Sequence, residues 1–223
     1  PEGTENGLPV FSPENLHEQI ATGLKMENVV QMVRQIESLP TLPQTVQRVQ
    51  EAMADPETLL KDIAEIVQQD PPIAARLLQL ANSAAYGFLS RVSNVHSAIT
   101  LLGLRETYMA VLSSAVLDLT AKGKGFDHDQ YWRTSMFCAS AARKIAAAAG
   151  QARNPAVFTA GLLSDIGRYA LSQAVPARYS KLDQTVSGAE LAEQEETALG
   201  IGHPEAGHIL AVHWNLPEDL ATA

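Results

Sequence analysis

Apolar residues recur along this chain at spacings of three and four, the period of an amphipathic α-helix. In the first half such stripes predict helices near residues 29–36, 59–67 and 73–81. The residues that form them are Val29, Val33, Ile36, Leu59, Ile63, Ile66, Val67, Ile73, Leu77, Leu78 and Ala81. The segment 108–119 is apolar enough for a strand, but Met109, Leu112, Val116 and Leu119 keep the helical spacing. We therefore predict a helix there too.

The second half shows the same periodicity, with alanine at several apolar positions. Phe137, Ala141, Ile145 and Ala148 form a narrow stripe, which predicts a helix face in close contact with a neighbouring helix. A further helix is predicted over 162–171. Since we find neither an alternating strand pattern nor a fixed-period repeat, the pattern predicts an all-α fold.

Helix boundaries are indicated by capping residues. A polar residue followed by proline is typical of a helix start and occurs at Asp70-Pro71, Asn154-Pro155 and His203-Pro204, although histidine is a poor cap. Gly103 and Gly200 follow apolar runs, where a residue that tolerates positive φ ends a helix.

These signals divide the chain into a lead-in and one helical domain. Residues 1–25 form the lead-in, in which residues 1–11 are polar and rich in Gly and Pro and one short helix is predicted from Ser12. Residues 26–223 are predicted to form the domain. Its best internal boundary is the loop at 122–129, which separates lobes over about 26–121 and 129–223.

Charge and composition narrow the classes of partner. The formal net charge of −9 opposes direct contact with nucleic acid phosphates, because no strong basic cluster offsets it. Cys138 is the single cysteine, which excludes an internal disulfide and fits a cytoplasmic setting. The chain contains no apolar run of the length needed for membrane insertion.

Several segments together resemble the HDOD family, helical output modules of bacterial signalling proteins related to the HD-type metal phosphohydrolases. The most specific segment is DPPIAARLLQLANSAAYG at 70–87, and the resemblance covers about 39–220. It marks as family-signature or interaction residues Asp70, Pro71, Asn82, Ser83, Tyr86, Gly103, His203 and Trp214. The turn at 82–87 ends a helix or forms part of a docking face, and the sequence does not choose between these roles.

The resemblance also bears on metal binding. HD enzymes hold a divalent ion with a His on one helix, a His-Asp pair on a later one and a further Asp. In this chain Thr134 stands at the first position and Ser164-Asp165 at the pair. Hydroxyl groups are weak ligands for transition metals, so the resemblance implies a vestigial site without metal or cofactor. We expect the Asp165 carboxylate to accept a hydrogen bond from Thr134 or Ser164.

Other polar residues have two interpretations. Arg168 is either a contact for an anionic ligand or an exposed helix residue that balances nearby acids. His203, His208 and His213 are five residues apart, so they turn about 140° per step and cannot share one helix face. We therefore expect them to cap, pack or face solvent rather than bind a metal together.

The resemblance implies a non-catalytic signalling module that contacts a protein partner or a linked sensory or receiver domain. Two alternatives remain open: a metal-dependent phosphohydrolase of nucleotides or cyclic dinucleotides with a different ligand set, and a small-molecule sensor that uses the vestigial pocket. The input signal, the partner, flanking domains and the oligomeric state are not encoded in any pattern that we recognise.

Overall fold

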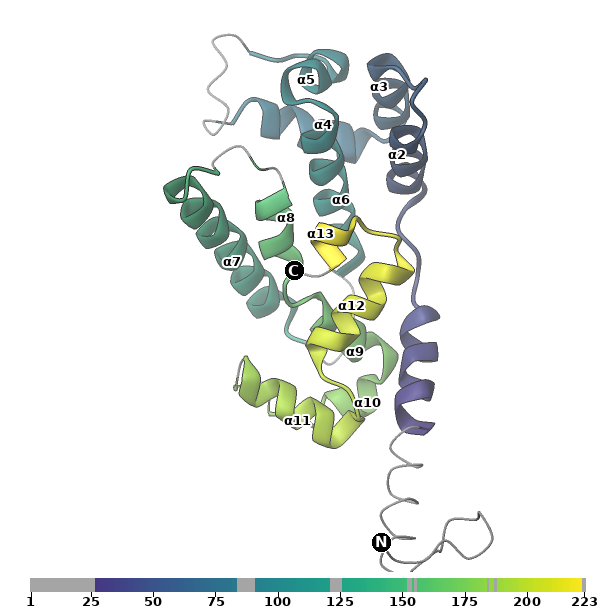
Figure 1. Ribbon diagram of the computed structural model, residues 1–223, viewed down its shortest axis with the longest axis vertical. Coiled ribbons are helices and arrows are strands. Elements are labelled where there is room, and N and C mark those ends of the chain that lie inside the picture. The colour runs from purple at the N-terminus through teal and green to yellow at the C-terminus, as the bar shows by residue number, and fades with distance from the viewer. Residues whose placement is uncertain are drawn as a thin grey trace, which may run out of the picture.

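The computed structural model describes residues 27–83, 91–120, 126–151, 154, 156–183, 185–186 and 188–221. All of its regular elements are α-helices, so the predicted all-α class is confirmed for this part of the chain (Figure 1). No helix within the described ranges is long and apolar enough to span a bilayer.

The first half begins with residues 27–37, which are helical. The helices that follow are α2 (Gln44–Ala54), α3 (Leu60–Gln68), α4 (Pro71–Ala81), α5 (Val95–Leu102) and α6 (Leu104–Thr120). Helices α2 to α5 pack around one end of the long helix α6 (Figure 1). The segment 108–119 lies within α6, as the helical spacing predicts.

The second half contains α7 (His128–Ala148), α8 (Ala156–Leu163), α9 (Ile166–Ala174), α10 (Pro176–Tyr179), α11 (Ala189–Leu199), α12 (His203–His213) and α13 (Glu218–Ala221). Helix α7 packs along α8, and α9 packs along α12. Helix α6 also contacts α8 near its middle, where the Ser113 and Thr159 hydroxyl oxygens lie 3.3 Å apart.

Several predicted boundaries are confirmed by the backbone. Asp70 is the N-cap of α4 and accepts a hydrogen bond from the Ile73 N–H at 3.3 Å, with Pro71 at the first helical position. Gly103 ends α5 with φ of 85°, and Gly200 ends α11 with φ of 89°. A helix also begins at His203-Pro204, as predicted, but its N-cap is Gly202 and His203 is its first residue.

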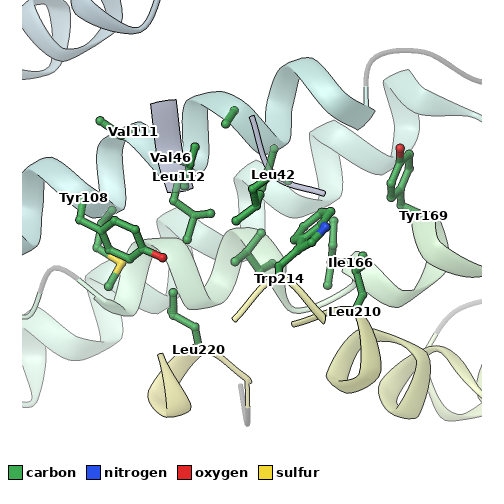
Figure 2. Packing of buried hydrophobic residues seen from close by; sticks show 14 of the residues in the cluster. Leu42, Val46, Tyr108, Val111, Leu112, Ile166, Tyr169, Leu210, Trp214 and Leu220 are labelled. Carbon is green, nitrogen blue, oxygen red and sulfur yellow. The ribbon is translucent and has the colours of Figure 1, made fainter. Parts of the chain in front are cut away.

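One hydrophobic cluster includes residues from both halves of the described chain. Trp214, just after α12, lies close to Leu42 from the segment before α2 and to Ile166 of α9 (Figure 2). Its indole N–H donates to the carbonyl of Pro40 at 3.1 Å. Trp214 is buried in this cluster, and its packing joins the two halves.

The stripe on α7 is the main departure from the predicted packing. Phe137 and Ile145 are 73% and 70% exposed, whereas Tyr131, Ser135 and Ala139 form the buried face. Helix α8 approaches α7 at Ala139, where a Cβ on Gly161 would lie 2.8 Å from the Ala139 Cα. The predicted close contact between helices exists, but it uses a different face of α7.

Candidate functional site

Two of the three vestigial metal-site positions, Ser164 and Asp165, lie in the turn between α8 and α9, and the third lies on α7. Thr134 is exposed on α7, and Ser164 is exposed in the turn between α8 and α9. The Ser164 hydroxyl donates to the Gly161 carbonyl at 3.1 Å. Among the described hydrogen bonds, the Asp165 carboxylate receives none from either hydroxyl, so that expected contact is wrong.

Asp165 is the residue just before α9, and it pairs with a cation in the first turn of that helix. Its Oδ2 lies 3.8 Å from Nη1 of Arg168, three residues later. The Arg168 side chain is only 14% exposed. The interpretation of Arg168 as a residue that balances a nearby acid is therefore confirmed, but its expected exposure is wrong, since most of its side chain is buried.

Helix α7 adds two buried hydroxyl groups near this ion pair. Burial raises the pKa of Tyr131; the charge of Asp165 adds to this effect, while Ser135 and Arg168 oppose it. The Tyr131 Oη, the Ser135 Oγ and the Arg168 Nε are buried, and none makes a hydrogen bond of standard geometry within the described ranges. Buried polar groups are normally paired, and the lowering of the Tyr131 pKa by Ser135 indicates that these two hydroxyls face each other.

A second group of polar side chains lies on the other side of Arg168. The Glu195 carboxylate is fully buried and accepts from the Tyr179 hydroxyl at 3.1 Å and from the His203 backbone N–H at 2.7 Å. Its Oε2 also lies 2.6 Å from the His203 Nδ1. Burial raises the pKa of Tyr179; Glu195 raises it further, while Arg168 lowers it.

These contacts connect side chains from five helices into one unit. We call it the buried polar cluster, and it consists of Tyr131, Ser135, Asp165, Arg168, Tyr179, Glu195 and His203.

The sequence analysis did not identify Tyr131, Tyr179 or Glu195, although a signal for Glu195 exists. The spacing of Leu191, Glu195 and Leu199 by four places the glutamate on the buried face of α11. A carboxylate there requires hydrogen-bond donors.

A close crossing of α9 and α12 positions the cluster. A Cβ on Gly167 would lie 1.8 Å from the carbonyl oxygen of His203, and a Cβ on Gly207 would lie 3.2 Å from the nitrogen of Gly167. The two backbones can approach this closely only without side chains. This crossing brings His203 beside the helix that carries Arg168.

The other two histidines have separate backbone partners. His208 Nδ1 lies 2.8 Å from the Ala221 carbonyl, and His213 Nε2 lies 3.3 Å from that of Leu39. The described residues include no group of three or more His, Cys, Asp or Glu arranged to hold a metal ion. The HD ligand set does not fit this site, because its one retained carboxylate faces a guanidinium.

A cavity of about 240 Å³ opens beside Ser164. It lies between the turn before α9, helix α12 and helix α13, and its walls are mostly apolar. Its polar lining includes Ser164 and His208, whereas Thr134 and Asp165 are absent from the lining. It is therefore distinct from the pocket expected between the helices of Thr134 and Asp165.

The signature residues of the first half serve local structure. The Asn82 side chain donates to the carbonyls of Leu78 and Val92 and accepts from the Val92 N–H, each at 2.8 Å. The Ser83 Oγ is buried without a partner among described residues. Tyr86 lies outside the described ranges, so the docking role of this turn stays a prediction.

Comparison with known proteins gives three findings. The HDOD domain profile matches residues 39–223. The crystal structure of an HDOD domain protein of unknown function from Geobacter sulfurreducens is 30% identical, covers 85% of this chain and 66% of its own, and has a TM-score of 0.67. The crystal structure of a candidate phosphohydrolase from Shewanella amazonensis SB2B is 27% identical. The match covers 86% of this chain and 69% of that one, with a TM-score of 0.69.

A curated relative from Treponema pallidum (strain Nichols), an uncharacterized protein, is 29% identical over 190 residues. The match includes 83% of this chain but 36% of that protein, so the chain spans about a third of the length of this relative.

Proposed function

The chain belongs to the HDOD domain family, and from this premise we propose that it is a non-catalytic regulatory module of a signalling protein. It acts through contact with a protein partner or with a linked sensory or receiver domain. The ion pair between Asp165 and Arg168 carries the non-catalytic part of the proposal.

A metal ion at the HD position would need ligands that this site does not offer. The Asp165 carboxylate lies 3.8 Å from the guanidinium of Arg168, which already neutralises its charge. A fixed cation at about 4 Å repels a divalent ion by several kcal/mol at the effective dielectric of a protein surface. Thr134 and Ser164 provide only neutral hydroxyls, which bind such ions weakly.

In the proposed mechanism, a partner or linked domain changes the packing of the helices in the second half. The buried polar cluster supports this mechanism because it connects α9, α10, α11 and α12 through charged and hydrogen-bonded groups. Such groups tolerate few alternative arrangements, so a shift of one helix is transmitted to the others. The single cysteine is consistent with a cytoplasmic location for this module.

The metal content of the protein tests this proposal. We expect protein purified without chelators to hold far less than one equivalent of manganese, iron or zinc by elemental analysis. We also expect titration with Mn²⁺ to give no saturable heat in calorimetry. About one equivalent of tightly held metal, lost in an Asp165→Ala variant that still folds, would show instead a metal-dependent hydrolase with a different ligand set.

A small-molecule sensor is a second candidate, favoured by the cavity beside Ser164. Its volume of about 240 Å³ and its apolar walls suit a small ligand with one or two polar groups. Native mass spectrometry of freshly purified protein tests this candidate. A bound mass that disappears in a Ser164→Trp variant would support it, and only the unliganded mass would exclude a tightly retained ligand.

A further inference from the structure

The outward face of α7 is apolar, and no described helix covers it (Figure 1). Phe137 and Ile145 are the two most exposed large hydrophobic side chains among the described residues, and Met136 is also exposed. Phe137 and Ile145 are eight residues apart, about 80° around the helix, and two apolar side chains of this size on its outward side exceed the scattered exposure that is normal for a surface. We call Arg133, Phe137, Lys144 and Ile145 the α7 outer face.

This face is basic although the chain is acidic. Helix α7 carries three cationic residues, Arg133, Arg143 and Lys144, against one acidic residue, Asp129 in its first turn, in a chain with a net charge of −9. Arg133 and Lys144 are exposed, and their separation of 11 residues corresponds to about three helical turns, or roughly 16 Å. A partner surface that complements the α7 outer face therefore needs acidic side chains on either side of apolar ones.

The corner between α2 and α3 has this composition. Residues 51–65 contain five acidic residues and one lysine. Leu59 is 54% exposed at the N-cap of α3, and Leu60 beside it is exposed. We call the surface formed by Glu51, Asp55, Glu57, Leu59 and Leu60 the acidic corner.

Local hydrogen bonds fix the shape of the acidic corner. The Asp55 carboxylate accepts from the Glu57 N–H at 2.9 Å, and that of Asp62 accepts from the Leu59 N–H at 2.8 Å. The two leucines are therefore presented on an ordered turn, which lowers the entropy cost of docking.

We propose that copies of this chain associate head to tail, with the α7 outer face of one copy docked on the acidic corner of the next. The two surfaces lie on opposite sides of the molecule (Figure 1). Because the contact joins two different surfaces, each added copy leaves one surface free for the next. The assembly therefore grows in one direction, either into a closed ring or into an open chain. Two apolar anchors on each side give a small interface, so the affinity is modest, with a Kd on the order of 10–100 µM.

Two other occupants of the α7 outer face fit the charges less well. A two-fold contact between two α7 helices would bring two copies each of Arg133, Lys144 and Asp129 to one interface, which leaves a net positive charge there. An anionic membrane would attract three cations but repel a molecule with a net charge of −9. The inference stands apart from the proposed function, because a module with or without a metal site can associate in this way.

Sedimentation equilibrium of the untagged chain tests the proposal. At about 5 to 500 µM, we expect the weight-average mass to rise from 24.0 kDa beyond twice that value. Phe137→Glu and Leu59→Lys each remove one of the two surfaces, so each variant alone should stay at 24.0 kDa. An equal mixture of the two should give dimers and nothing larger, because one intact surface of each kind remains.

Val212→Glu is the matched control, since Val212 is 59% exposed on α12 outside both surfaces and its replacement should leave assembly unchanged. If either test variant has a changed circular dichroism spectrum, Ile145→Glu and Leu60→Lys replace it. A wild-type chain that stays monomeric would overturn the proposal, as would a dimer that Leu59→Lys does not affect. So would binding to phosphatidylglycerol vesicles that Phe137→Glu abolishes while the chain in solution stays monomeric.

Discussion

At the scale of single residues, the buried polar cluster depends on Glu195. This carboxylate has no exposed surface, and it accepts hydrogen bonds from the Tyr179 hydroxyl and the His203 backbone N–H while facing the His203 ring. A buried carboxylate with this many donors is stabilised by all of them, and each donor loses its acceptor if the carboxylate is removed. Glu195 is therefore the residue whose loss should disturb the cluster most.

We predict that Glu195→Ala lowers the free energy of unfolding by about 3 kcal/mol, because several buried donors are left without an acceptor. Glu195→Gln should cost less, since its amide oxygen still accepts. Urea unfolding followed by far-ultraviolet circular dichroism measures both. Glu193→Ala on the exposed face of the same helix is the control, with a change within about 0.5 kcal/mol. Equal losses at the two positions would contradict the assigned role.

At the scale of elements, the crossing of α9 and α12 sets the geometry of the second half. Gly167 and Gly207 let the two backbones approach until a single Cβ would overlap the opposite chain. The crossing also determines where α12 begins relative to α11, and so where His203 meets Glu195. Neither glycine is required for its own helix to form. Glycine is required at both positions only because α9 and α12 pack against each other at this distance.

We predict that Gly167→Ala lowers the free energy of unfolding by about 3 kcal/mol or more, since its Cβ would lie 1.8 Å from the His203 carbonyl oxygen and the helices would have to separate. Gly207→Ala should cost less, because its nearest contact would be 3.2 Å. Chemical denaturation of the two variants compares them at the same crossing. A larger loss for Gly207→Ala would contradict this geometry.

At the scale of the whole molecule, contacts between the two halves join them through residues far apart in sequence. Gln50 of α2 donates to the Tyr108 hydroxyl of α6 at 2.7 Å and to the Asn215 carbonyl after α12 at 3.0 Å. Trp214 adds its hydrogen bond to Pro40, and Arg105 of α6 pairs with Asp219 of α13. Unfolding of either half would break these contacts with the other, so we expect the two halves to unfold together.

The buried tyrosines make stability sensitive to alkaline pH. Burial raises the pKa of Tyr108 from 10.0 to about 12, and it also raises the pKa values of Tyr131, Tyr169 and Tyr179. Between pH 10 and 12 the unfolded chain loses protons that the folded chain retains. The stabilisation that the raised tyrosine pKa values contribute is therefore complete below pH 10, and it is lost as the pH rises through the pKa values of the folded state.

We expect the free energy of unfolding to fall steeply above pH 10, with Tyr108 accounting for about 2 to 3 kcal/mol by pH 12. Urea titrations at a series of pH values measure this slope, and tyrosinate absorbance reports the ionisation. Tyr108→Phe should show a shallower slope. If the variant and the wild-type chain lose stability in parallel, Tyr108 ionises at its ordinary pKa and the prediction is wrong.

The sequence by itself determined the class of fold and several helix boundaries in the described part of the chain. The single helix predicted over 162–171 is wrong, because α8 ends at Leu163 and α9 begins at Ile166, with Ser164 and Asp165 in the turn between them. Helical periodicity over 108–119 excluded a strand, and Asp70-Pro71, Gly103 and Gly200 marked real ends. These features are local, because the spacing of apolar residues and the φ preferences of Pro and Gly act over a few neighbours. They need no knowledge of what packs against each helix.

Only the tertiary structure decided which faces are buried and which polar groups meet. The alanine-containing stripe of α7 satisfies the rule for a buried face, yet α8 packs against Ala139 instead, and Phe137 faces solvent. Asp165 pairs with Arg168 rather than with Thr134 or Ser164, and Glu195 meets a histidine on the next helix. The physical reason is that burial and pairing depend on the approach of separate helices, which single-helix periodicity does not contain.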